Sequence, residues 1–105
     1  MPPSAVFPSR LKAARLRAGL TQMQLGVLAQ IDEYSASARI NQYERGKHQP
    51  DFGTAERLAS VLSVPLPYLF ASNENLARLI LFFGELDPSA QDKLLDLAID
   101  LMPDV

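Results

Sequence analysis

The chain has 105 residues, of which 48% are hydrophobic and 21% charged, enough for one modest hydrophobic core and an appendage. It contains no cysteine and a single histidine, His48, so disulfides, thiolate metal sites and a cluster of the usual metal ligands are excluded. Residues 1–9 lack the charged and apolar regions of a secretion signal, and no apolar run approaches the ~20 residues of a membrane span. We therefore expect a cytoplasmic protein that has no cofactor.

Charge is distributed unevenly along the chain. Residues 1–70 carry eight basic and five acidic side chains, a net charge of +3, whereas residues 71–105 carry two basic and seven acidic ones, a net charge of −5. This asymmetry is typical of a basic nucleic-acid-binding module joined to an acidic segment that avoids the polyanion. A chance scatter of surface charge is the alternative, and composition alone leaves both open.

The first predicted helix follows a proline-rich start. All eight prolines of the chain lie where elements should begin or end, which predicts an all-α protein. Ser9 is the predicted N-cap, Leu11, Ala14 and Ala18 share the inward face, and Gly19 ends the helix by adopting a left-handed conformation. Residues 1–8 are expected to form a flexible N-terminal segment.

The next two helices are shorter and more polar. Thr21 is the predicted cap of the second helix, in which Leu25, Leu28 and Ala29 form an inward stripe and Gly26 lets another helix approach closely. The third helix ends at Gly46, and its predicted inward residues are Ala36, Ile40 and Tyr43.

The remaining elements alternate caps and apolar stripes. Asp51 caps a fourth helix, and Pro65 and Pro67 open a short fifth one that ends at Phe70. The predicted inward residues of the fourth helix are Phe52, Ala55, Leu58, Ala59 and Leu62. Two amphipathic segments follow, separated by "DPSAQD", which supplies a cap and a proline at a helix start. The predicted architecture is a five-helix domain over 9–70 and a two-helix C-terminal extension over 71–105.

Three stretches of the predicted domain share a family resemblance: "RLKAARLRAGLTQMQLGVLA", "INQYERGKHQPD" and "LASVLSVPLPYLF". In this order and nearly this spacing they resemble the lambda-repressor and Cro type of helix-turn-helix domain, the xenobiotic-response-element family of bacterial regulators. The resemblance covers residues 9–70, about three fifths of the chain. It implies a five-helix DNA-binding domain and a regulator of transcription.

The third helix carries chemistry suited to reading a DNA groove. With Ile40 and Tyr43 inward, the 3.6-residue period places polar side chains on the opposite face. Asn or Gln can pair with adenine, Arg with guanine, Ser with several base edges, and an Ala methyl can meet the thymine methyl. The alternative is a solvated polar face. The candidate base-reading residues are Ser37, Ala38, Arg39, Asn41 and Gln42.

Other positions match structural or backbone-binding roles. The resemblance implies that Gln22 contacts the DNA backbone at the start of the second helix, aided by the helix dipole. It also implies a structural ion pair between Arg15 and Glu44, which ties the first helix to the third. The candidate backbone contacts are Gln22, Arg45, Lys47, Arg10 and Arg17, with Lys12 as a further possibility. No catalytic residue is predicted, because His48 has neither a nucleophile nor an orienting carboxylate beside it, and an enzyme is not expected.

The chain departs from the family pattern between Leu25 and Glu44. The interval is longer than usual by about four residues, close to one helical turn, and the surplus lies in "IDEYSAS". The usual glycine of the turn is absent. Either Asp32 caps a recognition helix lengthened by one turn, or residues 32–36 form a longer loop. Asp32 and Glu33 should repel phosphate unless they turn away or accept a hydrogen bond from cytosine N4.

The C-terminal segments carry more apolar surface than a two-helix hairpin can hide by itself. These residues are Leu76, Leu79, Ile80, Phe83, Leu94, Leu97 and Leu101. We favour a dimerisation element, with packing against the chain's own domain as the alternative. Dimers of this fold hold their reading helices about one DNA turn, ~34 Å, apart.

Two functions of different classes follow from these features. The favoured hypothesis is a sequence-specific DNA-binding transcription regulator, a repressor that binds an inverted-repeat operator as a homodimer. The alternative is an antitoxin-like interaction module whose C-terminal helices bind a protein partner. Substitutions of basic residues would spare that second activity, whereas changes at Leu79 or Phe83 would abolish it.

Overall fold

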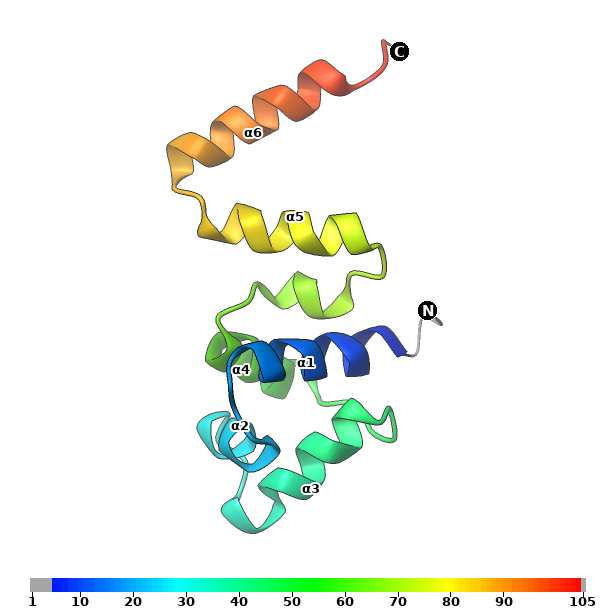
Figure 1. The fold of residues 1–105 in the computed structure, drawn as a ribbon, viewed down its shortest axis with the longest axis vertical. Helices are drawn as coiled ribbons and strands as arrows, with labels where there is room; N and C mark the ends of the chain where they lie inside the picture. Colours follow the sequence, from blue (N-terminus) through cyan, green and yellow to red (C-terminus); the bar gives the residue numbers. More distant parts are fainter. Residues whose placement is uncertain (1–4, 105) are drawn as a thin grey trace.

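The computed structural model describes residues 5–104, and all regular structure in that range is helical (Figure 1). The elements are α1 (Val6–Arg17), α2 (Gln22–Leu28), α3 (Glu33–Glu44), α4 (Phe52–Leu62), the 3-10 helix η2 (Leu66–Phe70), α5 (Glu74–Glu85) and α6 (Pro88–Leu101). The predicted all-α class, five short helices followed by two more, is confirmed. In the described part of the chain, no helix combines the length and apolar character that crossing a membrane requires.

Capping residues set most of the helix boundaries. The side chains of Thr21, Asp51 and Asp87 each accept a hydrogen bond from the backbone N–H three residues further on, at 2.7–3.0 Å. Each satisfies one of the N–H groups that a helix start leaves unpaired. Gly19 and Gly46 adopt positive φ values of 72° and 73°, and α1 and α3 end just before them. All five roles follow the sequence predictions.

The start of α1 differs from the prediction. The helix begins at Val6, so the assignment of Ser9 as its N-cap is wrong. Val6 and Phe7 are buried, and the ring of Phe7 packs on that of Phe70 with 5.2 Å between centroids. Pro8 is tolerated because the first turn of a helix needs no backbone N–H from it. The predicted flexible segment 1–8 is therefore too long, and its residues 1–4 lie outside the described residues.

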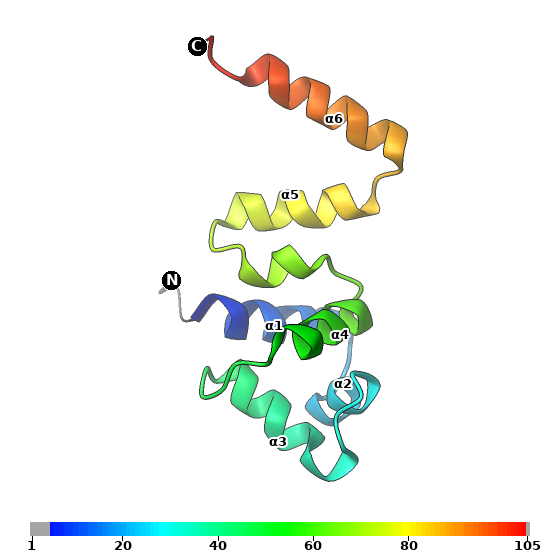
Figure 2. The same ribbon diagram turned by 180° about the vertical axis from the view of Figure 1, so that it is seen from behind.

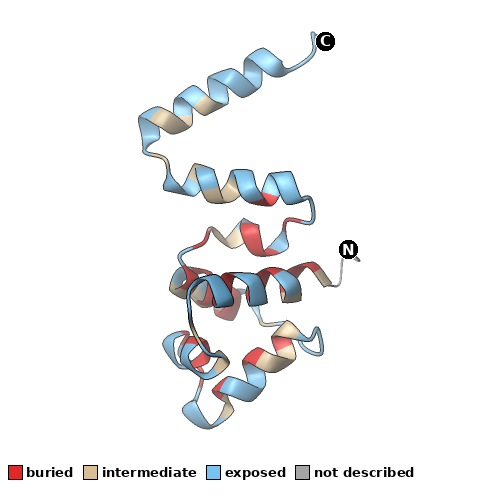
Figure 3. Ribbon diagram, viewed as in Figure 1, coloured by how far each residue is buried: buried red, intermediate tan, exposed pale blue. Residues whose placement is uncertain are grey.

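The core takes one large side chain from each of the first five helices. The largest fully buried residues are Leu11, Leu25, Ile40, Leu58 and Leu69, from α1, α2, α3, α4 and η2 in turn. Burying a side chain of this size contributes about 1.5–3 kcal/mol. Figure 3 shows the buried residues on the sides of these helices that face one another. All five helices thus pack around one hydrophobic core.

Three side chains predicted to point inward are exposed instead. Ala18 follows the last residue of α1, Leu28 ends α2 and Phe52 begins α4. All three lie at a helix end, where the neighbouring elements no longer cover the helix. The predicted periodicity is correct in the middle of each helix and fails at its first or last turn.

The C-terminal helices extend away from this core (Figures 1 and 2). α5 packs on η2 and contributes Ala77 to the buried core, and Arg10 of α1 forms an ion pair with Glu74 at 2.9 Å. α6 contains no buried residue. The molecule measures 54 × 30 × 22 Å, and α3 and α6 lie at opposite ends of the long axis. The accessible side of α3 is therefore remote from α6.

Candidate nucleic-acid interface

A tight turn joins α2 to α3 and decides between the two predicted conformations of the longer interval. α3 begins at Glu33 with Asp32 in the N-cap position, so the helix is lengthened by a turn and the prediction of a longer loop over 32–36 is wrong. The Asp32 side chain makes no capping hydrogen bond. Gln30 adopts a positive φ of 70°, and Ile31 N–H donates to Gly26 O at 2.9 Å. Gln30 thus provides the left-handed conformation for which the family uses glycine.

The solvent-facing side of α3 is polar. Its opposite side is buried through Ala36, Ile40 and Tyr43. Ser37 and Ala38 are exposed, and Asn41 and Gln42 are half-buried. The structure therefore brings four of the five candidate base-reading residues to the accessible part of this helix. Their contact with bases stays a prediction.

Arg39 lies beside Gln42 on the helix but away from Ala38 and Asn41. Its Nη2 donates a hydrogen bond to the Tyr43 hydroxyl at 3.0 Å. Arg39 lies two residues before Asn41, which is about 200° around the helix. The structure therefore does not bring Arg39 together with Ala38 and Asn41, although its side chain is exposed.

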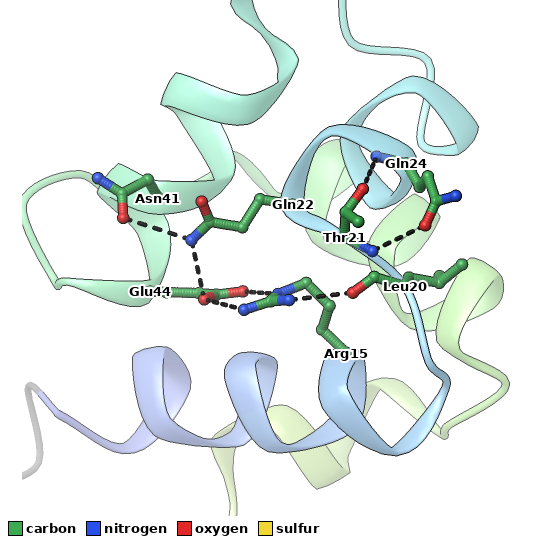
Figure 4. Close-up of polar contacts among 7 residues, drawn as sticks. All are labelled: Arg15, Leu20, Thr21, Gln22, Gln24, Asn41 and Glu44. Atoms are coloured by element: carbon green, nitrogen blue, oxygen red, sulfur yellow. Dashed lines mark hydrogen bonds and ion pairs between the residues drawn. The ribbon is translucent and has the colours of Figure 1, made fainter.

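Arg15 and Glu44 join α1 to α3 by a bidentate ion pair (Figure 4). Arg15 Nε donates to Glu44 Oε2 at 2.6 Å and Nη2 donates to Oε1 at 3.0 Å. The two side chains are only 10% and 3% exposed. The hydrogen bonds from its guanidinium to Glu44 raise the pKa of Arg15 above its ordinary value. Arg15 Nη1 also donates to Leu20 O at 3.0 Å, so this pair holds the chain between α1 and α2 as well.

Gln22 links this ion pair by hydrogen bonds to Asn41, on the accessible side of α3. Its Nε2 donates to Glu44 Oε1 at 3.2 Å and to Asn41 Oδ1 at 3.3 Å. Both N–H groups of the Gln22 amide are thus engaged within the protein, and a phosphate contact through Nε2 would have to replace one of them. Figure 4 shows Asn41 Nδ2 on the side away from Gln22. Gln22 therefore orients Asn41 with its N–H groups directed outward.

Basic side chains gather at the C-terminal end of α3. Lys47 N–H donates to Gln42 O at 3.0 Å, a hydrogen bond that spans Gly46 and satisfies a carbonyl group in the last turn of α3. Arg45, Lys47 and His48 are all exposed. Positive charge at this point suits the phosphates that border a groove occupied by α3.

Arg10 and Arg17 face the other way. Arg10 is only 7% exposed, and its Nε and Nη2 donate to Ala71 O at 3.0 and 2.9 Å. Arg17 lies over the Tyr68 ring of η2, with its guanidinium carbon 5.6 Å from the ring centroid. The helical period explains this, because both residues lie about 140–160° around α1 from Arg15, which faces α3. The structure therefore does not bring Arg10 and Arg17 together with α3, and their phosphate contacts stay a prediction.

Two residues near the interface were missed by the sequence analysis. Arg57 of α4 donates through Nε to Ala29 O at 2.9 Å and so fixes the end of α2. Tyr34 is 96% exposed in the additional turn of α3. Its spacing of four residues from Ala38 was the available signal, but that spacing has meaning only once the turn is known to be helical.

A capped helix, a tight turn and a second helix with an accessible polar side define the helix-turn-helix class of proteins. Residues 9–67 match the family described as helix-turn-helix domain, which is more than half of the chain. The crystal structure of the transcriptional regulator BswR has 50% sequence identity and a TM-score of 0.83, over 90% of this chain and 93% of that one. No curated protein sequence matches this chain significantly. The chain belongs to the helix-turn-helix family, which confirms its resemblance to helix-turn-helix transcription regulators.

Proposed function

We propose that the chain is a sequence-specific DNA-binding regulator of transcription that inserts α3 into the major groove. The observation that carries this proposal is the row of Ala38, Asn41 and Gln42 on the accessible side of α3, with Arg45 and Lys47 at its end. Amide and methyl groups in such a row can read base edges, while the two basic groups neutralise phosphates. Family membership and the likeness to a transcriptional regulator support the proposal.

Gln22 is given a revised role in this proposal. Its amide holds Asn41 and Glu44, so it positions a base-reading residue and contributes less to phosphate binding than expected from the resemblance. Arg45 and Lys47 are then the main backbone contacts.

The proposed regulator acts as a homodimer. α6 has no buried residue, and an apolar cleft of about 490 Å³ opens between η2, α5 and α6. Its lining includes Leu76, Leu79, Ile80, Phe83 and Leu94. A two-fold axis parallel to the long axis of the molecule would cover this apolar surface and bring both α3 helices to the same end. Such a dimer suits an inverted repeat, and repression by occupying it follows the family resemblance.

The antitoxin-like interaction module is the second candidate. The feature that favours it is the same apolar surface on an acidic segment, since residues 71–105 carry a net charge of −5. A basic protein partner would find both complementary charge and an apolar groove there. Under this alternative, changes on α3 leave the activity intact.

In vitro selection tests the proposed function directly. The full chain is incubated with a random duplex pool at near-physiological salt, and bound DNA is sequenced after several rounds. Enrichment of an inverted repeat with half-sites about one turn, ~34 Å, apart is the expected result. Binding that is only weak and salt-sensitive, with no enriched sequence, would favour the protein-partner alternative.

Two variants separate base reading from backbone binding. Gln42→Ala should weaken binding to the selected site by ~1–3 kcal/mol and relax the preference at one base pair.

Lys47→Ala should weaken binding to all sequences alike and make the salt dependence shallower by about one unit of slope. Fluorescence anisotropy at several salt concentrations measures both. An equal loss on every sequence for Gln42→Ala would remove Gln42 from the base-reading row.

A further inference from the structure

The additional turn of α3 carries an aromatic side chain that none of the residues 5–104 covers. Tyr34 is 96% exposed and is the second residue of the helix. Positions 34, 38, 41 and 45 are spaced by four, three and four residues, which places them within about 60° on one side of the helix. Tyr34 therefore begins the same row that continues through Ala38 and Asn41 to Arg45.

The charges along α3 indicate which part of DNA this turn would meet. Asp32 and Glu33 are exposed beside Tyr34, whereas Arg45 and Lys47 lie at the other end of the helix. Phosphates attract the basic end and repel the acidic end. When α3 lies in the groove, its first turn is therefore held over base edges, away from the phosphates that a tyrosine hydroxyl could otherwise bind.

The groove offers one apolar partner for an aromatic ring. The C5-methyl group of thymine is the apolar feature that base pairs present in the major groove. One helical turn adds about 5.4 Å of reading surface, which corresponds to roughly one or two further base pairs at 3.4 Å each. In a groove occupied by α3, Tyr34 would reach bases beyond those that Ala38 and Asn41 could contact.

We propose that Tyr34 is a specificity-determining residue whose ring packs against a thymine C5-methyl group at one end of each half-site. This inference rests on the proposed function, because it assumes that α3 occupies the major groove. It adds a sequence requirement that comes from the lengthened helix.

Deoxyuridine substitution tests the contact, because deoxyuridine lacks only the methyl group of thymidine. Each thymine of the selected operator is replaced in turn, and dissociation constants are measured for the wild type, Tyr34→Phe and Tyr34→Ala. At one thymine the wild type should lose about threefold to tenfold in affinity, as for one buried methyl group. Tyr34→Phe should behave like the wild type. Tyr34→Ala should bind more weakly and be insensitive to that methyl group.

Other results overturn the proposal. A Tyr34→Ala variant that binds as tightly as the wild type, or that keeps its sensitivity to every methyl group, excludes the contact. A loss for Tyr34→Phe equal to that for Tyr34→Ala would assign the contact to the hydroxyl group. A half-site that has no thymine sensitive to the substitution also refutes the inference.

The two levels of inference can fail separately. If Asn41→Ala loses affinity for the selected operator while Tyr34→Ala does not, only the role of Tyr34 fails. If selection yields no operator at all, the proposed function fails and the Tyr34 contact fails with it. Thermal unfolding of Tyr34→Ala provides the control, since removing a side chain that is 96% exposed should leave stability unchanged.

Discussion

Arg15 and Glu44 form a buried ion pair that also determines the arrangement of Gln22 and Asn41. Glu44 accepts hydrogen bonds from Arg15 and from Gln22, so it lies between α1 and the accessible side of α3. A buried pair of this kind contributes little net stability against an apolar substitute, but loss of one partner leaves an uncompensated charge. Its effect on the proposed base reading is therefore indirect and acts through the position of Asn41.

Arg15→Ala should lower the free energy of unfolding by about 3–5 kcal/mol, because the carboxylate of Glu44 stays buried without its partner. Urea unfolding followed by circular dichroism measures the change. Arg17→Ala is the matched control and should cost less than about 1 kcal/mol, since Arg17 is exposed and contributes a cation–π contact with Tyr68. Replacing both members by apolar residues, as in Arg15→Met with Glu44→Leu, should recover most of the loss. Equal effects of the two single Arg variants would contradict the buried-pair account.

Asp51 should contribute stability that depends on pH. Hydrogen bonds from the Thr54 backbone and side chain to its carboxylate, followed by the charges of Arg57 and Arg39, lower its pKa below the ordinary value of 3.8. The folded state therefore favours the charged carboxylate, and this contribution is fully present above pH 3.8 and lost as the pH falls through the lowered pKa. The stability difference between wild type and Asp51→Asn should shrink in that acidic range. Thermal unfolding at about pH 6, well above this range, and at about pH 3, within it, compares them; a difference independent of pH would refute the assignment.

The sequence predicted which residues lie on the accessible side of α3, but it did not predict the roles of the arginines in α1. Ile40 and Tyr43 fix the phase of α3, so the positions of Ala38 and Asn41 follow from the helical period. Arg10 and Arg17 look equally basic in the sequence, yet η2 and the start of α5 lie on their side of α1. Which face of α1 meets which element depends on the tertiary arrangement, and one sequence contains no direct signal for it.

The packing of α2 against α3 depends on a close approach at Gly26. A Cβ atom at this position would lie 2.7 Å from Ala36 Cβ and 3.0 Å from Ala36 Cα and O. Because these atoms belong to a short side chain and to backbone, α2 and α3 would have to separate. The cost in helix stability of a glycine here, about 1 kcal/mol, is thus offset by contact between the two helices.

Gly26→Ala should therefore destabilise the protein despite its better helix propensity, by about 1–2 kcal/mol net. It should also weaken operator binding, because α3 shifts relative to Gln22 at the start of α2. Gly53→Ala in α4 is the matched control, since its Cβ would meet nothing closer than 3.5 Å, at Arg57 Nη1. That variant should be as stable as the wild type or slightly more so. Chemical unfolding of both variants gives the comparison, and a stabilised Gly26→Ala would disprove the close-contact account.

Helix boundaries were predictable where a side chain caps the helix and were missed where packing extends it. Thr21, Asp51 and Asp87 act through local hydrogen bonds, which the sequence encodes directly. α1 instead starts at Val6 because Val6 and Phe7 are buried, and Phe7 packs on the distant Phe70. A contact across more than sixty positions leaves no local pattern.

At the scale of the whole molecule, α3, the proposed DNA-reading helix, and the apolar cleft at α6 lie at opposite ends. α5 is anchored to the domain, so the alternative of packing on the chain's own domain applies to α5 and not to α6. The acidic row of Asp92, Asp96 and Asp100, which are spaced by four residues, lies on the side of α6 opposite Leu94 and Ala98, which line the apolar cleft. The homodimer of the proposed function would cover the apolar side and leave this acidic row in solvent.

Leu94→Lys should dissociate the proposed dimer and reduce operator affinity, because Leu94 lines the apolar cleft, whereas the domain should still fold because α6 is not part of the core. Asp96→Lys makes a similar change on the opposite side of α6 and should leave the dimer intact. Sedimentation equilibrium over a range of protein concentrations measures both. A monomeric wild type, or equal dissociation by the two variants, would contradict dimerisation through the apolar side of α6.

Because α6 has no buried residue, DNA binding by the proposed regulator should depend steeply on the concentration of the protein. A helix of 14 residues that buries none of them is marginal in water, so α6 should gain helical order when a second chain covers it. Folding of the C-terminal helix and pairing of two chains then become one event that depends on concentration. Occupancy of the operator would rise more steeply than in proportion to the amount of protein. A modest fall in synthesis or a modest increase in degradation would then suffice to release the DNA.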